Sequence, residues 1–182
     1  MVLAFGNQGG LRMCHIYRVG GYVKLAKLWE RSRDKALAYH NEYYKKKYKN
    51  NLQMELIDVY IDITGNKHIY HRPEMIRLLC DCKTGRVNCV AAQTKGYLAA
   101  DFEEFCYMYS YVSEFNNGIV FITEDSHYQI DTLDNPERQK EELKRMSEKY
   151  ISAAPKEYEL WKKKLTKAMV KHMNIEKGSS NG

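Results

Sequence analysis

A run of lysines interleaved with tyrosines, at residues 43–49, is the densest set of side chains in the sequence that could bind a ligand. Lysine ammonium groups neutralise phosphates, and aromatic rings stack on bases. Four lysines are therefore candidates for weak, salt-sensitive contacts with a DNA backbone: Lys45, Lys46, Lys47 and Lys49. The alternative is a solvated helix end, whose lysines interact favourably with the negative end of the helix dipole. The sequence leaves both interpretations open.

Two other groups of residues have the types that bind metals, but neither has a recognised spacing. One group has the thiols and imidazoles of zinc sites: Cys80, Cys82, Cys89, His68 and His71. Cys82 falls on the expected inner face of a helix, which favours buried free thiols over a zinc site. The other group has carboxylates near expected strand ends: Asp58, Asp62, Glu124 and Asp125. Ligands commonly bind at that edge of a parallel sheet, yet these spacings predict no metal and no cofactor.

Composition excludes membrane and secreted proteins as classes. The 182 residues are 44% hydrophobic and 29% charged, which is typical of a globular protein with one core. No window approaches the ~20 apolar residues of a membrane span, and residues 1–10 lack the basic and apolar segments of a signal peptide. The five cysteines are an odd number and lie within apolar patterns, as in a reducing interior. We therefore expect a cytoplasmic protein without a membrane partner.

The positive charge is spread unevenly along the chain. A net charge of +6 and 15 tyrosines suggest a polyanion-binding protein. Residues 22–50 contain nine basic and three acidic side chains, whereas residues 51–132 contain six basic and twelve acidic ones. Residues 133–182 are basic again, with twelve basic side chains against eight acidic ones. DNA binding would therefore use the first helix and the tail of the chain.

Periodicity predicts strands and helices in alternation. Strands are expected at residues 12–19, 54–63, 87–92 and 119–123, and helices at residues 22–49, 73–84 and 102–116. Gly20-Gly21 is expected to form a turn after the first strand, and Asp101 with Glu104 a capping box at the third helix. This order predicts an α/β fold in three layers, with a mostly parallel sheet of about four strands covered by helices on both sides.

The pattern after Thr132 is helical only. Pro136 and Pro155 each begin a helix, and the second helix carries a stripe of Tyr158, Trp161, Leu165, Met169 and His172. The stripe could dock on its own domain or serve as a dimerisation helix. We expect one domain over residues 1–132, a helical tail over 133–177 and a disordered end at 178–182.

Several motifs between residues 12 and 132 resemble, in order and spacing, the catalytic domain of serine recombinases, the resolvase and invertase family. The matching segments are Ile16-Tyr17-Arg18-Val19, Val59-Tyr60-Ile61-Asp62, Arg72-Pro73-Glu74-Met75-Ile76-Arg77-Leu78-Leu79, Lys83-Thr84-Gly85-Arg86-Val87-Asn88-Cys89-Val90 and Ile130-Asp131-Thr132. The resemblance implies a resolvase-like fold followed by C-terminal helices.

The family's catalytic residues are missing from the matching positions. Family members attack a DNA phosphodiester with a serine that follows an arginine of the first strand by two residues, and clustered arginines stabilise the pentavalent phosphate. The resemblance aligns Arg18 with that arginine and Gly20 with the serine. Tyr97 and Ala100 stand where the family has a second pair of arginines. Glycine has no nucleophilic group, so the resemblance implies no covalent chemistry.

Two arginines remain at family arginine positions, Arg18 and Arg72, and both could contact a phosphate. The alternatives are a surface ion pair for Arg72 and, for Arg18, pairing with a core carboxylate such as Asp62.

The resemblance implies a catalytically inactive serine-recombinase-like protein with a DNA-binding, regulatory or architectural role in recombination of a mobile genetic element. Its expected partners are DNA and a second copy or a related recombinase. Two other classes stay open. An enzyme with a re-purposed active site would have a deep pocket lined by Arg18, Asp62, Arg72 and Glu124. A protein–protein interaction module would not bind DNA even at ~50 mM salt.

Overall fold

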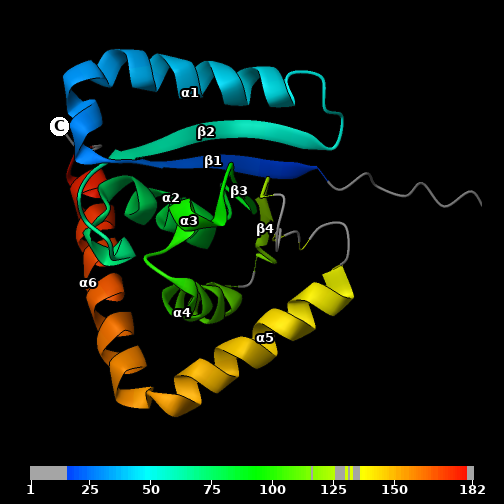
Figure 1. Ribbon diagram of the computed structural model, residues 1–182, viewed down its shortest axis with the longest axis vertical. Coiled ribbons are helices and arrows are strands. Elements are labelled where there is room, and N and C mark those ends of the chain that lie inside the picture. The colour runs from blue at the N-terminus through cyan, green and yellow to red at the C-terminus, as the bar shows by residue number, and fades with distance from the viewer. Residues whose placement is uncertain (1–15, 116, 126–129, 131, 133–135, 180–182) are drawn as a thin grey trace, which may run out of the picture.

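Helices surround one parallel sheet in the computed structural model, which describes residues 16–115, 117–125, 130, 132 and 136–179 (Figure 1). The described strands are β1 (Tyr17–Leu25), β2 (Met54–Ile63), β3 (Cys89–Ala92) and β4 (Val120–Thr123). All neighbours are parallel, and their order across the sheet is β2-β1-β3-β4. The predicted α/β class and parallel sheet are therefore confirmed.

Helices cover both faces of the sheet (Figure 1). The described helices are η1 (a 3₁₀ helix, Lys27–Ser32), α1 (Arg33–Tyr48), η2 (a 3₁₀ turn, Ile69–His71), α2 (Pro73–Lys83), α3 (Lys95–Leu98), α4 (Phe102–Ser113), α5 (Pro136–Ala153) and α6 (Pro155–Ser179). Helix α1 covers one face, and α2 and α4 cover the other. The tail adds to the second side, because α5 packs against α4 and α6 against α2 and η2.

The first strand runs straight through the two glycines that were predicted to form a turn. Gly20 pairs with Val90, and Gly21 pairs with Ala91, in the middle of β1. A Cβ atom on Gly21 would lie 2.7 Å from the ring of Tyr44 on α1, and one on Gly20 would lie 2.7 Å from Leu78 on α2. The glycines therefore allow both helix layers to approach the sheet closely, a role of glycine inside strands. The predicted turn is wrong.

This longer strand also shortens the first helix. Residues 22–25 were predicted to be helical but belong to β1, and α1 begins only at Arg33. Leu28 and Trp29, within the predicted helix, lie in η1 and are 69% and 46% exposed.

The other boundaries follow the sequence pattern closely. Strand β2 has the predicted bounds, and α2 begins at Pro73 and is followed by Gly85 at φ 78°. The Asp101 side chain accepts a hydrogen bond from the Glu104 amide (2.8 Å) and caps α4. Strand β3 begins two residues later than predicted, at Cys89, and β4 one residue later, at Val120.

The apolar stripe of α6 is buried against its own domain. Trp161 is 6% exposed, and Leu165 and Met169 are at most 1% exposed, within the core cluster that also contains residues of α2 and α4. The stripe is thus covered within the chain, and a dimer contact would need another face of this helix. Helix α6 continues through Ser179, which contradicts the predicted disordered end at residues 178 and 179.

Some predictions concern positions outside the described residues: the strand start at 12–15 with Cys14, Asp131 of the Ile130–Thr132 motif, and residues 180–182. Within the described part of the chain, no helix combines the length and apolarity needed to span a lipid bilayer.

Candidate functional site at the carboxyl edge of the sheet

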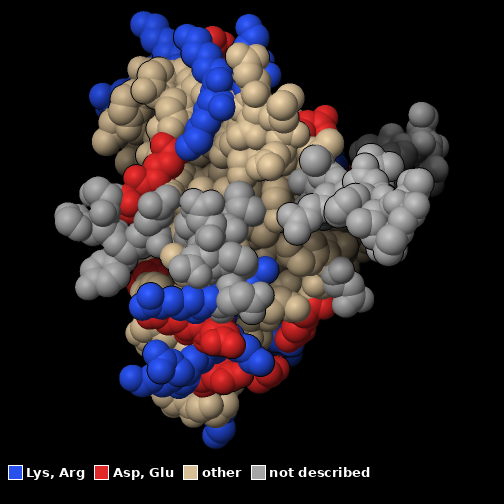
Figure 2. All heavy atoms as spheres, turned by 90° about the vertical axis from the view of Figure 1, so that its right-hand side faces the viewer, with Lys and Arg blue, Asp and Glu red and all other residues tan. Residues whose placement is uncertain are grey.

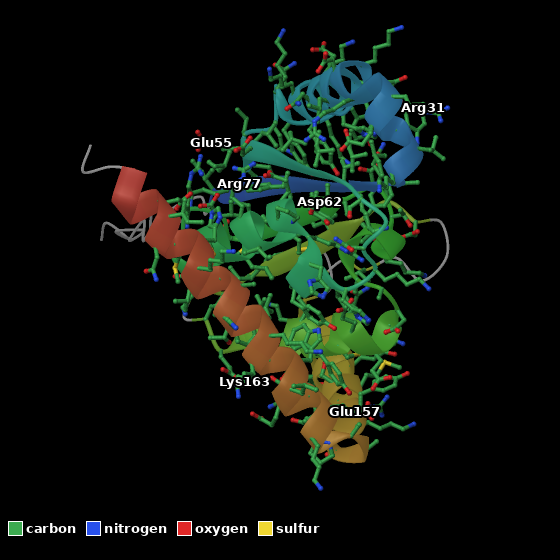
Figure 3. All side chains as sticks on the ribbon, turned by 90° about the vertical axis from the view of Figure 1, so that its left-hand side faces the viewer. Arg31, Glu55, Asp62, Arg77, Glu157 and Lys163 are labelled. Atoms are coloured by element: carbon green, nitrogen blue, oxygen red, sulfur yellow. The ribbon has the colours of Figure 1, made fainter. Side chains whose placement is uncertain are left out.

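All four strands end at the same edge of the sheet because they are parallel, and β1 and β2 run toward the left of Figure 1. In folds of this kind, ligands bind beyond the carboxyl ends of the strands. The residues at this edge are therefore the first place to look for chemistry. Figure 3 views the molecule from this side, with Asp62 near the middle and α6 crossing in front of the sheet.

Asp62, near the end of β2, holds the start of α2. Its carboxylate accepts hydrogen bonds from the backbone amides of Glu74 (3.1 Å) and Met75 (2.9 Å), and from the Tyr22 hydroxyl (3.0 Å). Burial, reinforced by the Asp62 charge, raises the pKa of Tyr22 well above its ordinary value. Asp62 is 4% exposed, and these bonds occupy both of its oxygens. It supports the frame, and no oxygen is left turned toward a ligand.

Arg72 is buried at the same edge. Its side chain is 1% exposed and donates hydrogen bonds to the carbonyls of Tyr97 (2.7 Å) and Lys67. Its Nε has no hydrogen-bond partner among the described residues. The pKa of nearby Lys24 is lowered, chiefly by burial and to a smaller extent by the Arg72 charge. A guanidinium in this position is no surface ion pair, which contradicts that predicted role, and the phosphate contact stays a prediction.

Arg18 lies at the opposite end of β1, near the amino edge. Its guanidinium donates two hydrogen bonds to the Gly85 carbonyl (3.1 and 2.8 Å), and its backbone amide donates to the Asn88 side chain (2.7 Å). Arg18 therefore fastens the turn after α2 and pairs with neither Asp62 nor any group of the carboxyl edge. The predicted pairing with a core carboxylate is wrong.

The other predicted acidic residues are engaged separately. Glu124 accepts hydrogen bonds from Tyr43 and Lys47, Asp125 from Thr94 (2.8 Å) and the Lys95 amide (2.7 Å), and Asp58 pairs with Arg77 (2.7 Å). The pocket that would have indicated a re-purposed enzyme is not formed by its four predicted residues. Asp62 and Arg72 both interact with Tyr22, whereas Arg18 and Glu124 have their partners elsewhere in the fold.

The cysteines of the predicted zinc group are buried thiols. Cys80, Cys82 and Cys89 are at most 4% exposed, and burial raises the pKa of Cys80 to about 11. Burial also raises the pKa of Cys82, and raised pKa values keep the Cys80 and Cys82 thiols protonated, a poor state for metal binding. Within the described ranges, no three histidine, cysteine or acidic side chains gather as metal ligands.

Glu104 joins three parts of the molecule at this edge, a role that the sequence pattern did not reveal. It is 4% exposed, and its carboxylate accepts hydrogen bonds from the amides of Ile69 (3.1 Å) and Ala100 (2.7 Å) and from the indole of Trp161 on α6 (3.1 Å). The imidazole of His68 lies 3.2 Å from the same carboxylate. The capping-box pattern placed Glu104 in the first turn of α4, but its partners come from distant segments.

Two solved structures are similar to this one. The N-terminal catalytic domain of TP901-1 integrase matches with a TM-score of 0.53 at 20% sequence identity, over 79% of this chain and 98% of that one. The C-terminal catalytic domain of ISC1926 TnpA, an IS607-like serine recombinase, matches with a TM-score of 0.46 at 18% identity, over 61% of this chain and 72% of that one. No family model and no curated protein matches the sequence. The chain has the fold of the TP901-1 integrase catalytic domain.

The resemblance aligned Gly20 with the family's nucleophilic serine, but β1 ends five residues later, at Leu25. Gly20 lies in the middle of the strand, and its Cβ position is filled by buried side chains, so it does not face the carboxyl edge. The family spacing of an arginine and a serine two residues later, placed at the strand end, falls on Lys24 and Ala26. Neither Gly20 nor Ala26 carries a hydroxyl.

The two positions that the resemblance aligned with the family's second arginine pair lie just before α4. Tyr97 is in α3, half-buried, and its carbonyl accepts the Arg72 guanidinium (2.7 Å). Ala100 is exposed, and its amide donates to Glu104. Both residues therefore contribute backbone groups, and neither offers a cation at this edge.

The lysine–tyrosine run divides into two faces. Tyr44 and Tyr48 are buried in the core and cannot stack on bases, whereas Lys45, Lys46 and Lys49 are exposed. Figure 2 shows basic side chains over α1 at the top of the molecule, while the helices below present both signs. The run is thus the basic end of a helix, with exposed lysines and with two tyrosines that pack into the protein core.

Proposed function

We propose that this chain takes part in DNA recombination without cutting DNA, as a regulatory or architectural protein built on the serine recombinase fold. Its proposed partners are a second copy or a related recombinase, together with DNA held through α1. The observation that carries the proposal is the end of β1, where a recombinase needs a nucleophile and this chain has Ala26.

The missing nucleophile does not depend on one choice of alignment. The sequence motif selects Gly20 and the strand end selects Ala26, and neither side chain can form a phosphoester. The pentavalent phosphate would also lack its cations, since Arg72 is buried on two carbonyls and Tyr97 and Ala100 carry no charge. Removing a single such group costs an enzyme ~10²–10³ in rate, so several losses together support a non-cleaving role.

The proposed DNA contact is modest because part of the α1 charge is already neutralised. Lys46 pairs with Glu42 (3.4 Å), and Lys47 pairs with Glu124. Lys45 and Lys49 complete the predicted phosphate-binding set. Binding through so few cations is electrostatic, independent of sequence and strongly weakened by salt.

Adduct formation with DNA tests the absence of cleavage. The protein is incubated with supercoiled plasmid, denatured and examined for protein covalently attached to DNA, with an active serine recombinase as positive control. We expect no adduct from the wild type or from Ala26→Ser, because a hydroxyl alone does not supply the missing arginines. An adduct from the wild type would disprove the proposal.

Fluorescence anisotropy with a labelled DNA duplex tests the proposed DNA contact. Binding at ~50 mM salt should weaken steeply by ~200 mM, and replacing all four lysines with glutamine should remove it. A comparison variant replaces four exposed lysines of the basic tail: Lys156, Lys163, Lys167 and Lys171. Loss of binding in only one of the two variants shows which basic segment contacts DNA. Absence of binding at the lower salt would instead favour a protein–protein interaction module.

A further inference from the structure

The two outer strands of the sheet differ in whether their free edges are occupied. Beside β4, Thr123 donates its amide to the Ile130 carbonyl (2.7 Å), and Thr132 donates to the Phe121 carbonyl (3.0 Å). The returning chain thus covers the β4 edge. The outer side of β2 has no pairing strand among the described residues. One edge of the sheet is therefore open.

The open part of β2 lies in its first half. The Gln53 carbonyl accepts a hydrogen bond from the Tyr17 amide on β1 (2.8 Å), so alternation turns the backbone groups of Met54 and Leu56 away from β1. The register shifts after Leu56, and beyond this irregularity the Asp58 carboxylate accepts the Val59 amide (2.8 Å). Met54 and Leu56, in the first half of β2, thus present backbone groups on its outer side.

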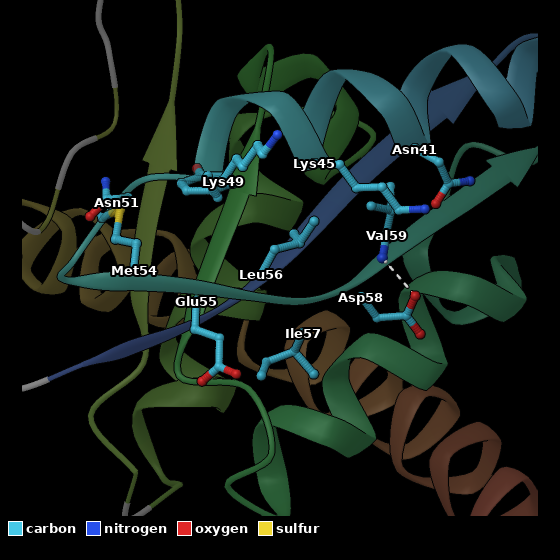
Figure 4. Close-up of a pocket in the computed structure, with 11 residues that line it drawn as sticks. Asn41, Lys45, Lys49, Asn51, Met54, Glu55, Leu56, Ile57, Asp58 and Val59 are labelled. Carbon is cyan, nitrogen blue, oxygen red and sulfur yellow. Dashed lines mark hydrogen bonds between the residues drawn. The ribbon is translucent and has the colours of Figure 1, made fainter.

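A groove of about 430 Å³ follows this stretch, between β2 and the second half of α1 (Figure 4). Helix α1 contributes Asn41, Lys45 and Lys49 above the strand, and β2 contributes Leu56 on the same side. Glu55 and Ile57 point away from α1, to the other face of the strand. A molecule in the groove would meet basic side chains on one face of the strand and an acidic side chain on the other.

Lys45 and Lys49 differ from the two lysines between them. Lys46 and Lys47 have acidic partners, whereas no ion pair joins Lys45 or Lys49 to another described residue. Four residues of helix span about 6 Å, and every second side chain of an extended strand repeats at about 6.6 Å. Because α1 runs alongside β2, acidic side chains at alternate positions of an added strand would face both lysines.

We propose that this groove binds an extended peptide segment of a partner protein, with acidic side chains at alternate positions, which adds to β2 as a further strand. Backbone hydrogen bonds to Met54 and Leu56 hold the peptide, and Lys45 and Lys49 select its charge. Between the acidic residues, apolar or basic side chains face Ile57 and Glu55. The proposal shares Lys45 and Lys49 with the proposed DNA contact, so the peptide and DNA would compete for these two lysines.

Two other occupants fit the groove less well. A second copy paired through the same stretch in one continuous sheet would place Glu55 near the same residue of that copy, and lysines near lysines, which is unfavourable. A DNA phosphate in the groove could pair with the lysines but has no N–H or C=O groups to bond the open backbone edge as a further strand. An acidic peptide satisfies both the lysines and the backbone groups.

The test uses the full chain and a fluorescein-labelled peptide of alternating aspartate and valine. We expect saturable binding at low salt, which the double variant K45E/K49E weakens by about tenfold or more. The control is Lys46→Glu, which reverses one charge on the same helix outside the groove and should leave binding within about twofold. A peptide with lysine in place of aspartate should not bind.

A peptide N-methylated on alternate amides separates strand addition from charge attraction. Methylation on the side that faces β2 should abolish binding, and methylation on the opposite side should leave it unchanged. Equal binding by both methylated peptides would overturn the proposal, as would equal loss in Lys46→Glu or absence of binding to any peptide. A dimer that K45E/K49E dissociates would identify a second copy as the occupant and overturn it as well, whereas duplex DNA, which is proposed to contact the same lysines, is expected to compete with the peptide. The adduct experiment is unaffected by any of these results.

Discussion

The carboxyl edge and the β2 edge of the same sheet use their charged residues in opposite ways. At the carboxyl edge, Asp62, Arg72 and Glu104 are buried and hydrogen-bonded to backbone groups of neighbouring loops. At the β2 edge, Lys45 and Lys49 are exposed beside unpaired backbone. The first set holds the molecule together, and the second set is free to bind.

This difference has a physical cause. A charge removed from water must be matched by hydrogen bonds, so the buried residues of the carboxyl edge have little capacity left for a ligand. The family-like motif around Arg72 lies in that buried set. A resemblance carried by such residues therefore reports the fold more directly than the chemistry.

Removing the Glu104 carboxylate should produce the largest loss of stability. Glu104→Ala leaves the amides of Ile69 and Ala100 and the Trp161 indole without an acceptor, and we expect a loss of about 3–5 kcal/mol in the free energy of unfolding. Urea unfolding followed by circular dichroism measures it. The control is Glu103→Ala, next in sequence, which loses only a contact with the Tyr107 hydroxyl and should cost about 1 kcal/mol or less. Equal costs would contradict the view of this edge as a structural centre.

Closing the space above Gly21 should have the next largest effect. The Tyr44 ring lies where the new Cβ of Gly21→Ala would stand, and its hydroxyl is bonded to the Ala91 carbonyl (3.2 Å). We expect a loss of about 1–3 kcal/mol, measured by the same unfolding curves. Gly65→Ala, which meets no atom within 4 Å, should change stability by less than about 0.5 kcal/mol.

Acid should weaken the α1 face through His40. Burial lowers the pKa of His40, and its Nδ1 has no hydrogen-bond partner among the described residues. The unfolded chain then binds a proton that the folded chain resists, so stability is complete above about pH 6.5 and falls as the pH drops below that value. Melting temperatures measured from about pH 7.5 to 5 should fall less in His40→Phe than in the wild type, by roughly 1–2 °C. Parallel curves for the two proteins would refute this assignment.

The smallest effect on stability is expected from the groove. Lys45→Gln should change the free energy of unfolding by less than about 0.5 kcal/mol, because this exposed lysine has no ion pair to lose. Lys47→Gln breaks the pair with Glu124 and should cost up to about 1 kcal/mol. A larger cost for Lys45→Gln than for Lys47→Gln would show that Lys45 is structural, and would remove the contrast between the two edges.

Local sequence signals predicted the helices and strands well, but they predicted the roles of the residues at the carboxyl edge poorly. The bounds of β2, the start of α2 at Pro73 and the Asp101 cap depend on neighbouring residues, and all were predictable. Gly20-Gly21 suggested a turn because glycine pairs commonly mark turns, whereas here they make room for side chains of distant helices.

The candidate sites depended on contacts that no local pattern encodes. Nothing near Arg72 in the sequence shows that it would be buried against the carbonyls of Tyr97 and Lys67. The lysines of α1 look equivalent in sequence, and only the placement of α1 above β2 separates Lys45 and Lys49 from Lys46. The sequence thus identified the basic run, but not which members of it were free.

The covered edge of β4 sets a limit on assembly. Sheets that expose two open edges can stack without end into fibres, because each added chain offers a new edge to the next. Here Ile130 and Thr132 occupy the β4 side of the sheet, so a copy of this chain that binds a strand through β2 has no second open edge of its own. Within the described residues, strand addition to this sheet is therefore limited to the β2 side.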